Sequence, residues 1–263
     1  MQVCHVGGRK APFAAHRPIK QKSSEDDMIT LYGMTSPNVV KIIIALEELG
    51  LPYEFKAVDI FTGQQFDPAF VKLNPNAKVP VIVDSDGPGG KPYTVFESGA
   101  ILLYLAEKAG KFLPTERAAR YDVIQWLVVQ LTGVGPMFGQ FVHFFRFAPQ
   151  GNDYSVSRYR TQVKRVCDVL ETRLGEVPYL GGAEYSIADM ATFPWGRNIK
   201  MLLGDGANAY PKILAWVEKI EKRPAVASAI AKVEKMRETL TAFDKAKPEM
   251  LDKIFGRGQH ALA

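Results

Sequence analysis

The stretch VPVIVDSDGPGGKPYTVFESGAI, residues 79–101, decides the fold class of this chain. Residues 79–84 and 93–95 are rich in β-branched and aromatic side chains and have the length of short strands, and the glycines within 87–90 supply a turn between them. An amphipathic period begins at Ser98 and continues to residue 108, which predicts a helix. The stretch therefore reads strand, turn, strand, helix, the end of an α/β unit.

The residues before this stretch complete the unit. Alternating side chains predict strands at 28–32 and 53–58, and residues 67–73 form a short helical period. Between the two strands, Asn38 precedes an apolar run that ends at Gly50, and these two residues are start and stop signals for a helix of about three turns. The order β-α-β-α-β-β-α predicts a short four-stranded sheet with helices on its faces.

Only helical periods follow this unit. The expected helices are 117–147, 153–175, 186–203, 211–222 and 224–242. Gly133, Gly135 and Pro136 predict a kink in the first of these helices. Ser186 and Asp189 form the start signal of the third, a role in folding with no chemistry attached.

The fold class is therefore α/β plus all-α. We expect an α/β domain over residues 28–109 and an all-helical domain over residues 117–243, with a linker that contains Pro114. Residues 1–27 lack a sustained apolar period and are interpreted as an extended N-terminal arm, and residues 244–263 form a C-terminal tail.

Composition and charge argue against several classes of protein. The net charge is +5, but the 33 basic residues are interspersed with acidic ones, a pattern typical of solvated helix faces and not of a nucleic-acid groove. No apolar run approaches the ~18 residues that span a bilayer, and no secretory signal is visible. The four histidines are dispersed and no glycine-rich loop follows a strand, so we expect no metal and no nucleotide. Cys4 and Cys167 form no disulfide framework, and Cys167 has the spacing of an inert core thiol. The expected location of the protein is cytoplasmic.

The Val79-Pro80 step is unusual because proline cannot donate to a β-ladder. One interpretation is a cis peptide at the mouth of the strand, which turns the N–H and C=O of Val79 outward to pair with an extended peptide ligand. The other is a trans proline that begins an ordinary strand. Taken alone, the residues leave both open.

Glu97 and Ser98 place a carboxylate and a hydroxyl at the first turn of the helix that ends the unit. A helix N-terminus binds anions through its free N–H groups. Ser98 would then hold a carboxylate and Glu97 an amine, which together make a clamp for an amino-acid head group. Simple capping of the helix is the alternative.

Several motifs in this order resemble those of the glutathione transferase superfamily: Ser36-Pro37-Asn38, Asn74-Pro-Asn-Ala-Lys-Val-Pro80, Phe96-Glu97-Ser98-Gly-Ala-Ile-Leu-Leu-Tyr-Leu105 and Ser186-Ile-Ala-Asp189. Four more are similar to those of its Nu class: Thr35-Ser-Pro-Asn38, Gly63-Gln-Gln-Phe66, Gly135-Pro-Met-Phe-Gly-Gln140 and His143-Phe-Phe-Arg146. That class contains glutathione-dependent disulfide-bond oxidoreductases and is related to a fungal nitrogen-catabolite regulator. The resemblance covers residues 28–235.

The resemblance implies a thioredoxin-like domain that holds glutathione, a helical domain that borders a second-substrate pocket, and a homodimer. The implied glutathione contacts are Gln65, Lys78, Val79, Pro80, Glu97, Ser98 and, across the dimer, Arg158. Glu97 and Ser98 would take the γ-glutamyl amine and carboxylate, and the backbone of Val79 would pair with the cysteinyl unit. For Lys78 and Arg158 the alternative is an ordinary surface charge.

The resemblance also places the nucleophile on glutathione, because no cysteine lies near residues 33–40. The catalytic candidates are Ser36, Asn38 and Thr35, at the N-terminus of the first helix, where hydroxyl, amide and backbone N–H groups would stabilise a thiolate. Which of the two hydroxyls faces the sulfur stays open. His143 and Arg146 are candidates for the second-substrate pocket, with helix packing as the alternative.

The leading hypothesis is a glutathione-dependent thiol–disulfide oxidoreductase, in which a bound glutathione thiolate attacks a small-molecule disulfide and a second glutathione resolves the product. One alternative keeps the thiolate but changes the electrophile: conjugation, peroxide reduction or ether cleavage. Another is a regulatory module that binds glutathione without catalysis. Neither a nucleic acid nor a membrane is an expected partner.

Overall fold

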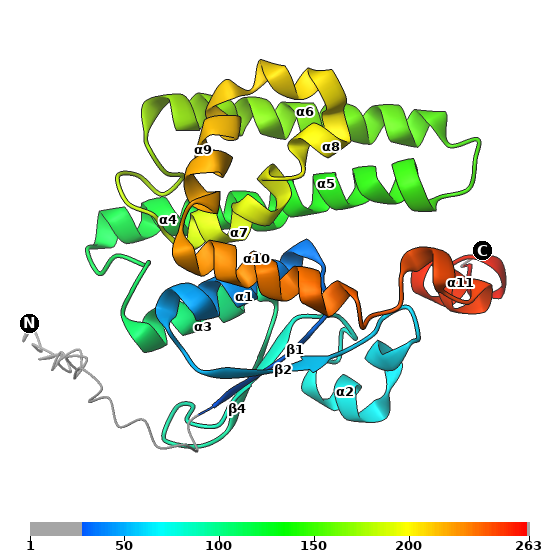
Figure 1. Ribbon diagram of the computed structural model, residues 1–263, viewed down its shortest axis with the longest axis horizontal. Helices are drawn as coiled ribbons and strands as arrows, with labels where there is room; N and C mark the ends of the chain where they lie inside the picture. Colours follow the sequence, from blue (N-terminus) through cyan, green and yellow to red (C-terminus); the bar gives the residue numbers. More distant parts are fainter. Residues whose placement is uncertain (1–27, 262–263) are drawn as a thin grey trace, which may run out of the picture.

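A four-stranded mixed sheet forms the base of the first domain in the computed structural model, which describes residues 28–261 (Figure 1). The strands are β1 (Ile29–Gly33), β2 (Tyr53–Ala57), β3 (Val81–Asp84) and β4 (Tyr93–Phe96), in the spatial order β2-β1-β3-β4. β1 is parallel to β2 and antiparallel to β3, and β3 is antiparallel to β4. This is the predicted four-stranded sheet, with β1, β2 and β4 within one residue of their expected bounds. β3 begins two residues late because Pro80 has no N–H for the ladder.

Helices cover both faces of this sheet. α1 (Pro37–Leu49) and α3 (Ser98–Ala109) pack on the face toward the helical domain, and α2 (Pro68–Leu73) lies on the opposite face (Figure 1). Alternate residues of β1 therefore point into different clusters: Leu31 belongs to the main core, and Tyr32 packs with the smaller cluster around Phe70. The α/β prediction is confirmed.

Helix α1 begins at Pro37, with Ser36 at the N-cap position, and not after an Asn38 cap as the sequence suggested. Proline already has the backbone angle of a first helical residue and lacks the N–H that would go unpaired there. The N–H groups of Val39 and Val40 donate to the Ser36 carbonyl at 2.9 Å. Asn38 consequently lies inside the first turn.

The second domain is all-helical, as predicted. Its elements are α4 (Arg117–Val129), η2 (Gln130–Val134), α5 (Gly135–Val142), η3 (His143–Phe147), α6 (Asp153–Glu176), α7 (Ile187–Gly196), α8 (Ile199–Leu203), η4 (Gly204–Ala209), α9 (Pro211–Glu221) and α10 (Pro224–Arg237). The interruption expected near Pro136 is the π-helical turn η2, which precedes that proline. The expected helix 186–203 is divided into α7 and α8, and the last helix ends five residues earlier than expected.

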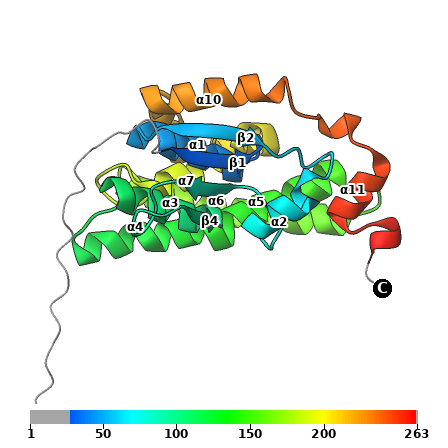
Figure 2. The same ribbon diagram turned by 90° about the horizontal axis from the view of Figure 1, so that it is seen from below.

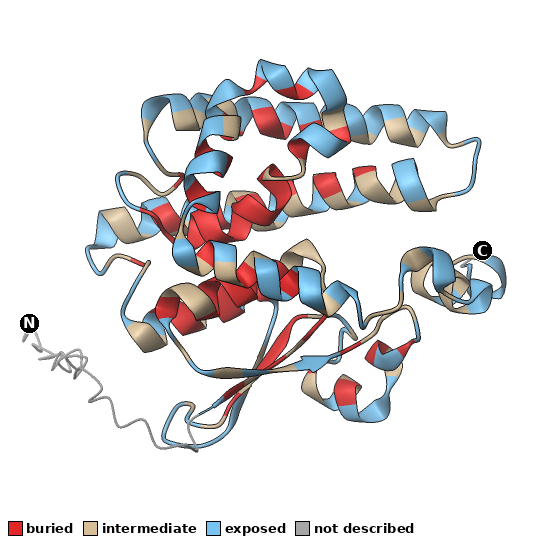
Figure 3. Ribbon diagram, viewed as in Figure 1, coloured by how far each residue is buried: buried red, intermediate tan, exposed pale blue. Residues whose placement is uncertain are grey.

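The start of α7 is held by the predicted capping box, and every residue of this helix is buried (Figure 3). The Ser186 hydroxyl accepts from the Ala188 N–H at 3.3 Å, and the Asp189 carboxylate accepts from the Ser186 N–H at 3.0 Å. Asp189 also accepts from the Leu180 N–H and the Trp216 indole. Burial raises the pKa of Asp189, so these donors are what make a carboxylate tolerable there.

The two domains share one core, and α1 is its centre. α1 packs against α3 from its own domain and against α7 and α10 from the other. At its C-terminal end, Glu48 forms a bidentate ion pair with Arg223, at 2.5 and 2.8 Å. Glu47 forms an ion pair with Lys232 through one of its carboxylate oxygens. The first domain is thus anchored to the second through the helix whose N-terminus faces the sheet edge.

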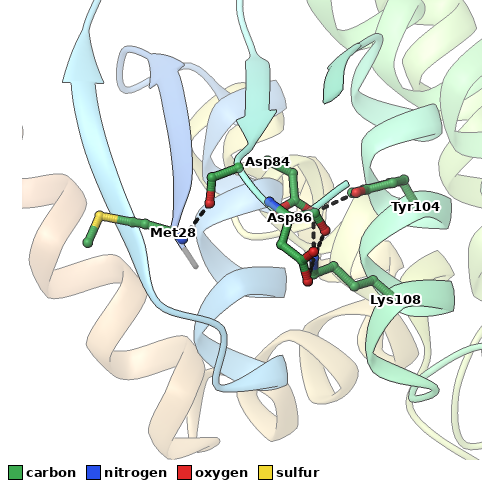
Figure 4. Close-up of polar contacts among 6 residues, drawn as sticks. Met28, Asp84, Asp86, Tyr104 and Lys108 are labelled. Carbon is green, nitrogen blue, oxygen red and sulfur yellow. Dashed lines mark hydrogen bonds and ion pairs between the residues drawn. The ribbon is translucent and has the colours of Figure 1, made fainter. Parts of the chain in front are cut away.

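A polar cluster ties the end of β3 to α3 (Figure 4). The buried Asp84 carboxylate accepts from the Tyr104 hydroxyl at 2.5 Å and from the Lys108 ammonium at 2.7 Å. Lys108 also donates to the Asp86 carbonyl at 2.6 Å, and the Met28 N–H donates to Ser85 at 2.9 Å. These bonds fix the direction of α3, and hence the position of its N-terminus at the other end.

The N-terminal arm, with Cys4, lies outside the described residues. Within residues 28–261 no helix has the length and apolar character needed to cross a bilayer.

Candidate functional site

A cavity of about 160 Å³ lies where the N-termini of α1 and α3 meet the residues that precede β3. Its lining residues are Asn38, Asn74, Asn76, Lys78, Val79, Pro80, Glu97 and Ser98. Six of these eight were candidates from the sequence, and they come from three segments that are far apart along the chain. The fold therefore gathers most of the predicted glutathione contacts around one cavity.

The peptide between Val79 and Pro80 is cis, the first of the two interpretations that the sequence left open. The ladder of β3 begins only at Val81, which pairs with Tyr32 and Phe96. Val79 thus lies just outside the sheet, at the cavity, where its backbone can meet an extended ligand.

Glu97 is held in an unusual backbone conformation at the rim of the cavity. It occupies the N-cap position of α3 with φ 66° and ψ 114°, and its side chain makes no capping hydrogen bond. Positive φ in a non-glycine residue is sparse in proteins and is concentrated at functional sites. The carboxylate is exposed at the rim, and Ser98 beside it is buried. The Glu97 side chain therefore does not cap α3, which was the alternative to a ligand contact.

Two asparagines of the cavity were missed as site residues. Asn74 is buried, its amide donates to the Lys78 carbonyl at 2.7 Å, and its side-chain oxygen accepts from the Asn76 N–H at 2.9 Å. These bonds shape the loop that presents Lys78 and Val79. The turn-forming Asn-Pro-Asn composition was the available signal.

The remaining glutathione candidates do not line the cavity. Thr35 and Ser36 are half-buried and lie near Asn38 in the sequence. Ser36 is the N-cap of α1, and Thr35 precedes it. Gln65 lies in η1 (Gln64–Phe66) and is buried, and its side-chain oxygen has no hydrogen-bond partner among the residues described. Arg158 is exposed on α6, as a residue that reaches a second subunit would have to be.

The second-substrate candidates also lie away from the cavity, on η3. Arg146 is exposed, whereas His143 is covered by the C-terminal tail. Phe255 packs on the His143 ring with centroids 4.9 Å apart, and the Arg257 guanidinium donates to the Phe147 carbonyl at 3.4 Å. Burial, together with the charge of Arg257, lowers the pKa of His143.

The C-terminal tail, from residue 243 onward, contacts both domains (Figure 2). It contains η5 (Phe243–Lys245), α11 (Pro248–Phe255) and η6 (Gly258–His260). Met250 fills the space beside Gly63, where a Cβ would come within 2.5 Å of it, and Lys253 lies 4.2 Å from the ring centre of Phe66. The same helix reaches η3 through Phe255, so α11 bridges the loop before α2 and the end of the α5 helix.

Lys41 is a functional candidate that sequence reasoning passed over. It is 0% exposed in the middle of α1, and its ammonium donates to the Gln130 side-chain oxygen at 3.0 Å. Burial lowers its pKa to about 7, and the charge of Glu97 acts in the opposite direction. A lysine inside the apolar run 39–46 was the signal, since fully buried lysines are rare.

Cys167 is the single cysteine among residues 28–261. Cys167 is buried, and burial raises the pKa of its thiol to about 12, so it is the inert core thiol that was expected. Residues 28–261 contain no group of three or more His, Cys, Asp or Glu side chains placed to hold a metal ion.

The cavity suits a small zwitterionic ligand. Asn38, Ser98 and the N-terminus of α3 offer hydrogen-bond donors, Lys78 a positive charge and Glu97 a negative charge. An amino-acid head group carries both charges, and an extended peptide offers backbone groups to Val79.

The comparisons with known proteins agree with this geometry. The glutathione S-transferase N-terminal domain model matches residues 28–107, and the C-terminal domain model matches residues 134–224. The disulfide-bond oxidoreductase YfcG of Escherichia coli is 46% identical over 208 residues, which are 79% of this chain and 96% of that protein.

Solved structures show the same likeness. A glutathione transferase family member from Pseudomonas fluorescens, with two glutathione bound, superposes with a TM-score of 0.74 at 43% identity, over 80% of this chain and 95% of that one. The glutathione transferase URE2P6 from Phanerochaete chrysosporium, in complex with oxidised glutathione, gives 0.75 at 33% identity, over 81% and 99%. With the thioredoxin-like and helical domains in place and both family models matched, this chain belongs to the glutathione S-transferase family.

Proposed function

We propose that this protein is a glutathione-dependent thiol–disulfide oxidoreductase that uses a bound glutathione thiolate in place of a protein cysteine. The observation that carries the proposal is the convergence of Asn38, Val79, Glu97 and Ser98 on one cavity, with the buried Cys167 as the single cysteine of the described residues. The name of the YfcG relative and the two glutathiones of the Pseudomonas structure support it.

Each end of glutathione has a partner in this proposal. Glu97 takes the γ-glutamyl amine, and Ser98 with the N-terminus of α3 takes the neighbouring carboxylate. Val79 pairs with the cysteinyl backbone. Lys78 attracts the glycyl carboxylate, and Gln65, which lies outside the cavity lining, is the further contact near the peptide that the family resemblance implies.

Asn38, with a hydroxyl from Ser36 or Thr35, stabilises the thiolate at the N-terminus of α1. Lowering a thiol pKa from about 8.5 to ~7 requires about 2 kcal/mol of preferential stabilisation. A side-chain amide together with the positive end of a helix supplies energies of this order.

The reaction is two thiol–disulfide exchanges. The glutathione thiolate attacks one sulfur of the substrate disulfide, a glutathione mixed disulfide forms, and the other sulfur leaves as a thiolate that takes up a proton. A second glutathione thiolate then attacks the glutathione sulfur of the mixed disulfide, which releases glutathione disulfide and the second substrate thiol. The protein orients and stabilises these thiolates without a covalent intermediate of its own.

Asn38→Ala tests this assignment. Turnover of a small disulfide, coupled to glutathione reductase, should fall about 10- to 100-fold while the Kd of glutathione changes by less than about threefold, because the amide acts on the thiolate and not on the peptide. Asn208→Ala, an exposed asparagine on η4, is the matched control. Unchanged turnover in Asn38→Ala would refute the mechanism.

The same assay separates the alternatives. Stable thioethers formed from a chloronitrobenzene would make conjugation to a small electrophile the main activity, with the glutathione site intact. Tight glutathione binding with no turnover of disulfide or electrophile would favour the regulatory module.

We also propose a cytoplasmic homodimer in which Arg158 of each subunit serves the other's site, so an active monomer in light scattering would exclude that role.

A further inference from the structure

Lys41 lies on the side of α1 that leads to the cavity. It follows Asn38 by three residues, so the two side chains share one face of the helix. Helical side chains lean toward the N-terminus, and the N-terminus of α1 is its end at the cavity. Since Lys41 is 0% exposed, its ammonium lies in the protein interior behind the cavity wall.

The group that holds this ammonium comes from the other domain. Gln130, at the start of the π-helical turn η2, is 1% exposed and accepts from the Lys41 Nζ at 3.0 Å. Its amide fits because residue 135 is glycine: a Cβ there would lie 3.0 Å from the Gln130 Nε2 and 3.3 Å from the Gln130 carbonyl oxygen. The helical domain thus fixes the position of a positive charge that belongs to the thioredoxin-like domain.

Glu97, at the rim of the cavity, is the charged group that acts on Lys41. The other helices that pack on α1 direct their charges elsewhere. The relevant pairs are Arg223 with Glu48, Lys232 with Glu47, and Asp189 with Ser186 and Trp216. Lys41 is therefore coupled to the cavity through Glu97, which lines it.

We propose that Lys41 is a positioning residue of the glutathione site, whose buried positive charge strengthens the binding of the anionic ligand and attracts Glu97, the carboxylate that receives the ligand amine. The inference rests on the proposed function, because it takes the cavity to be the glutathione site. Burial lowers the pKa of Lys41 to about 7, so the charge is present below neutral pH and is lost as the pH rises above it.

The binding of S-methylglutathione to the full chain, measured by calorimetry from about pH 6 to about pH 8.5, tests the inference. This ligand has no thiol to titrate and is net negative throughout. A unit charge about 10 Å away, at an effective dielectric constant near 20, changes affinity by about tenfold. We expect the wild type to bind about tenfold more weakly at the upper pH, with uptake of a proton on binding near pH 7.5.

Three variants separate charge from packing. Lys41→Met should bind with the weak affinity at every pH, and Lys41→Arg, which stays charged, should bind with the strong affinity at every pH. Lys200→Met, an exposed lysine on α8 in the helical domain, should retain the wild-type profile. His143 is present in all of them, so its titration contributes equally to every profile.

Parallel pH profiles in the wild type and Lys41→Met would overturn the inference while leaving the proposed glutathione site in place. If Lys41→Met does not fold, the wild type decides: proton uptake in buffers of different ionisation enthalpy supports the inference, and none overturns it. A wild type that binds no S-methylglutathione overturns the proposed function, and the inference with it.

Discussion

The buried amine of Lys41 should lower the stability of the protein, and Lys41→Met should therefore raise it. The pKa of Lys41 is about 7 in the native state and 10.5 in the unfolded chain. At a pH below both values, this difference lowers the free energy of unfolding by about 5 kcal/mol. Methionine has nearly the same length as lysine and no charge. Its cost is the unpaired Gln130 oxygen, about 2 kcal/mol.

The destabilisation caused by Lys41 is greatest at low pH and decreases as the pH rises. Below about pH 7 the native and unfolded states both carry the proton, so the whole cost is present. Above about pH 7 the native state loses the proton while the unfolded chain keeps it up to about pH 10.5, and the cost falls by about 1.4 kcal/mol per pH unit. The net gain in Lys41→Met is then about 3 kcal/mol at about pH 6 and near zero at about pH 9.

Urea unfolding followed by circular dichroism, at one protein concentration and at several pH values in this range, measures the difference between the two proteins. Groups other than Lys41 titrate in both and cancel. Lys108→Met is the control of opposite sign: it leaves the buried Asp84 short of a partner and should destabilise by about 2 kcal/mol. A difference between wild type and Lys41→Met that does not change with pH would refute the reasoning.

Three further predictions test the framework around the site. Arg223→Met should lower the free energy of unfolding by about 2–4 kcal/mol, because it leaves the buried Glu48 unpaired; an unchanged urea midpoint would contradict this. Asp189→Asn should cost a similar amount, since its amide would face donors, and thermal unfolding measures it. Phe255→Ala should uncover His143 and raise its pKa toward the ordinary value, as read from the imidazole resonances in NMR; a pKa that stays low would show that the tail does not cover it.

The fold was predictable because its signals are local. Gly50 has the left-handed conformation that ends a helix, and the Ser186 and Asp189 pair forms the expected capping box, so residue type alone marks these ends. The boundary error at Asn38 has an equally local cause. Proline at the first helical position was a competing start signal, and it is the one that the chain follows.

The site was predictable only in part, because its remaining features depend on contacts between distant residues. The pairing of Lys41 with Gln130 spans 89 positions, and no local pattern marks either residue as a partner of the other. The burial of His143 beneath Phe255 likewise depends on a tail that carries no family motif. Motifs located most of the groups that line the cavity, whereas the groups behind them required the tertiary structure.

The arrangement of α1 explains why the proposed glutathione site, whose lining residues belong to one domain, needs the other. The first turn of α1 carries Asn38 at the cavity, its middle carries the Lys41 ammonium held by Gln130, and its end is fixed by the Glu48 pair with Arg223. Every residue that lines the cavity belongs to the thioredoxin-like domain, yet the charge behind the cavity is positioned by the helical one. If the buried lysine lowers the free energy of unfolding, then packing does not explain why position 41 is a lysine. We then expect its contribution in ligand binding, as proposed above.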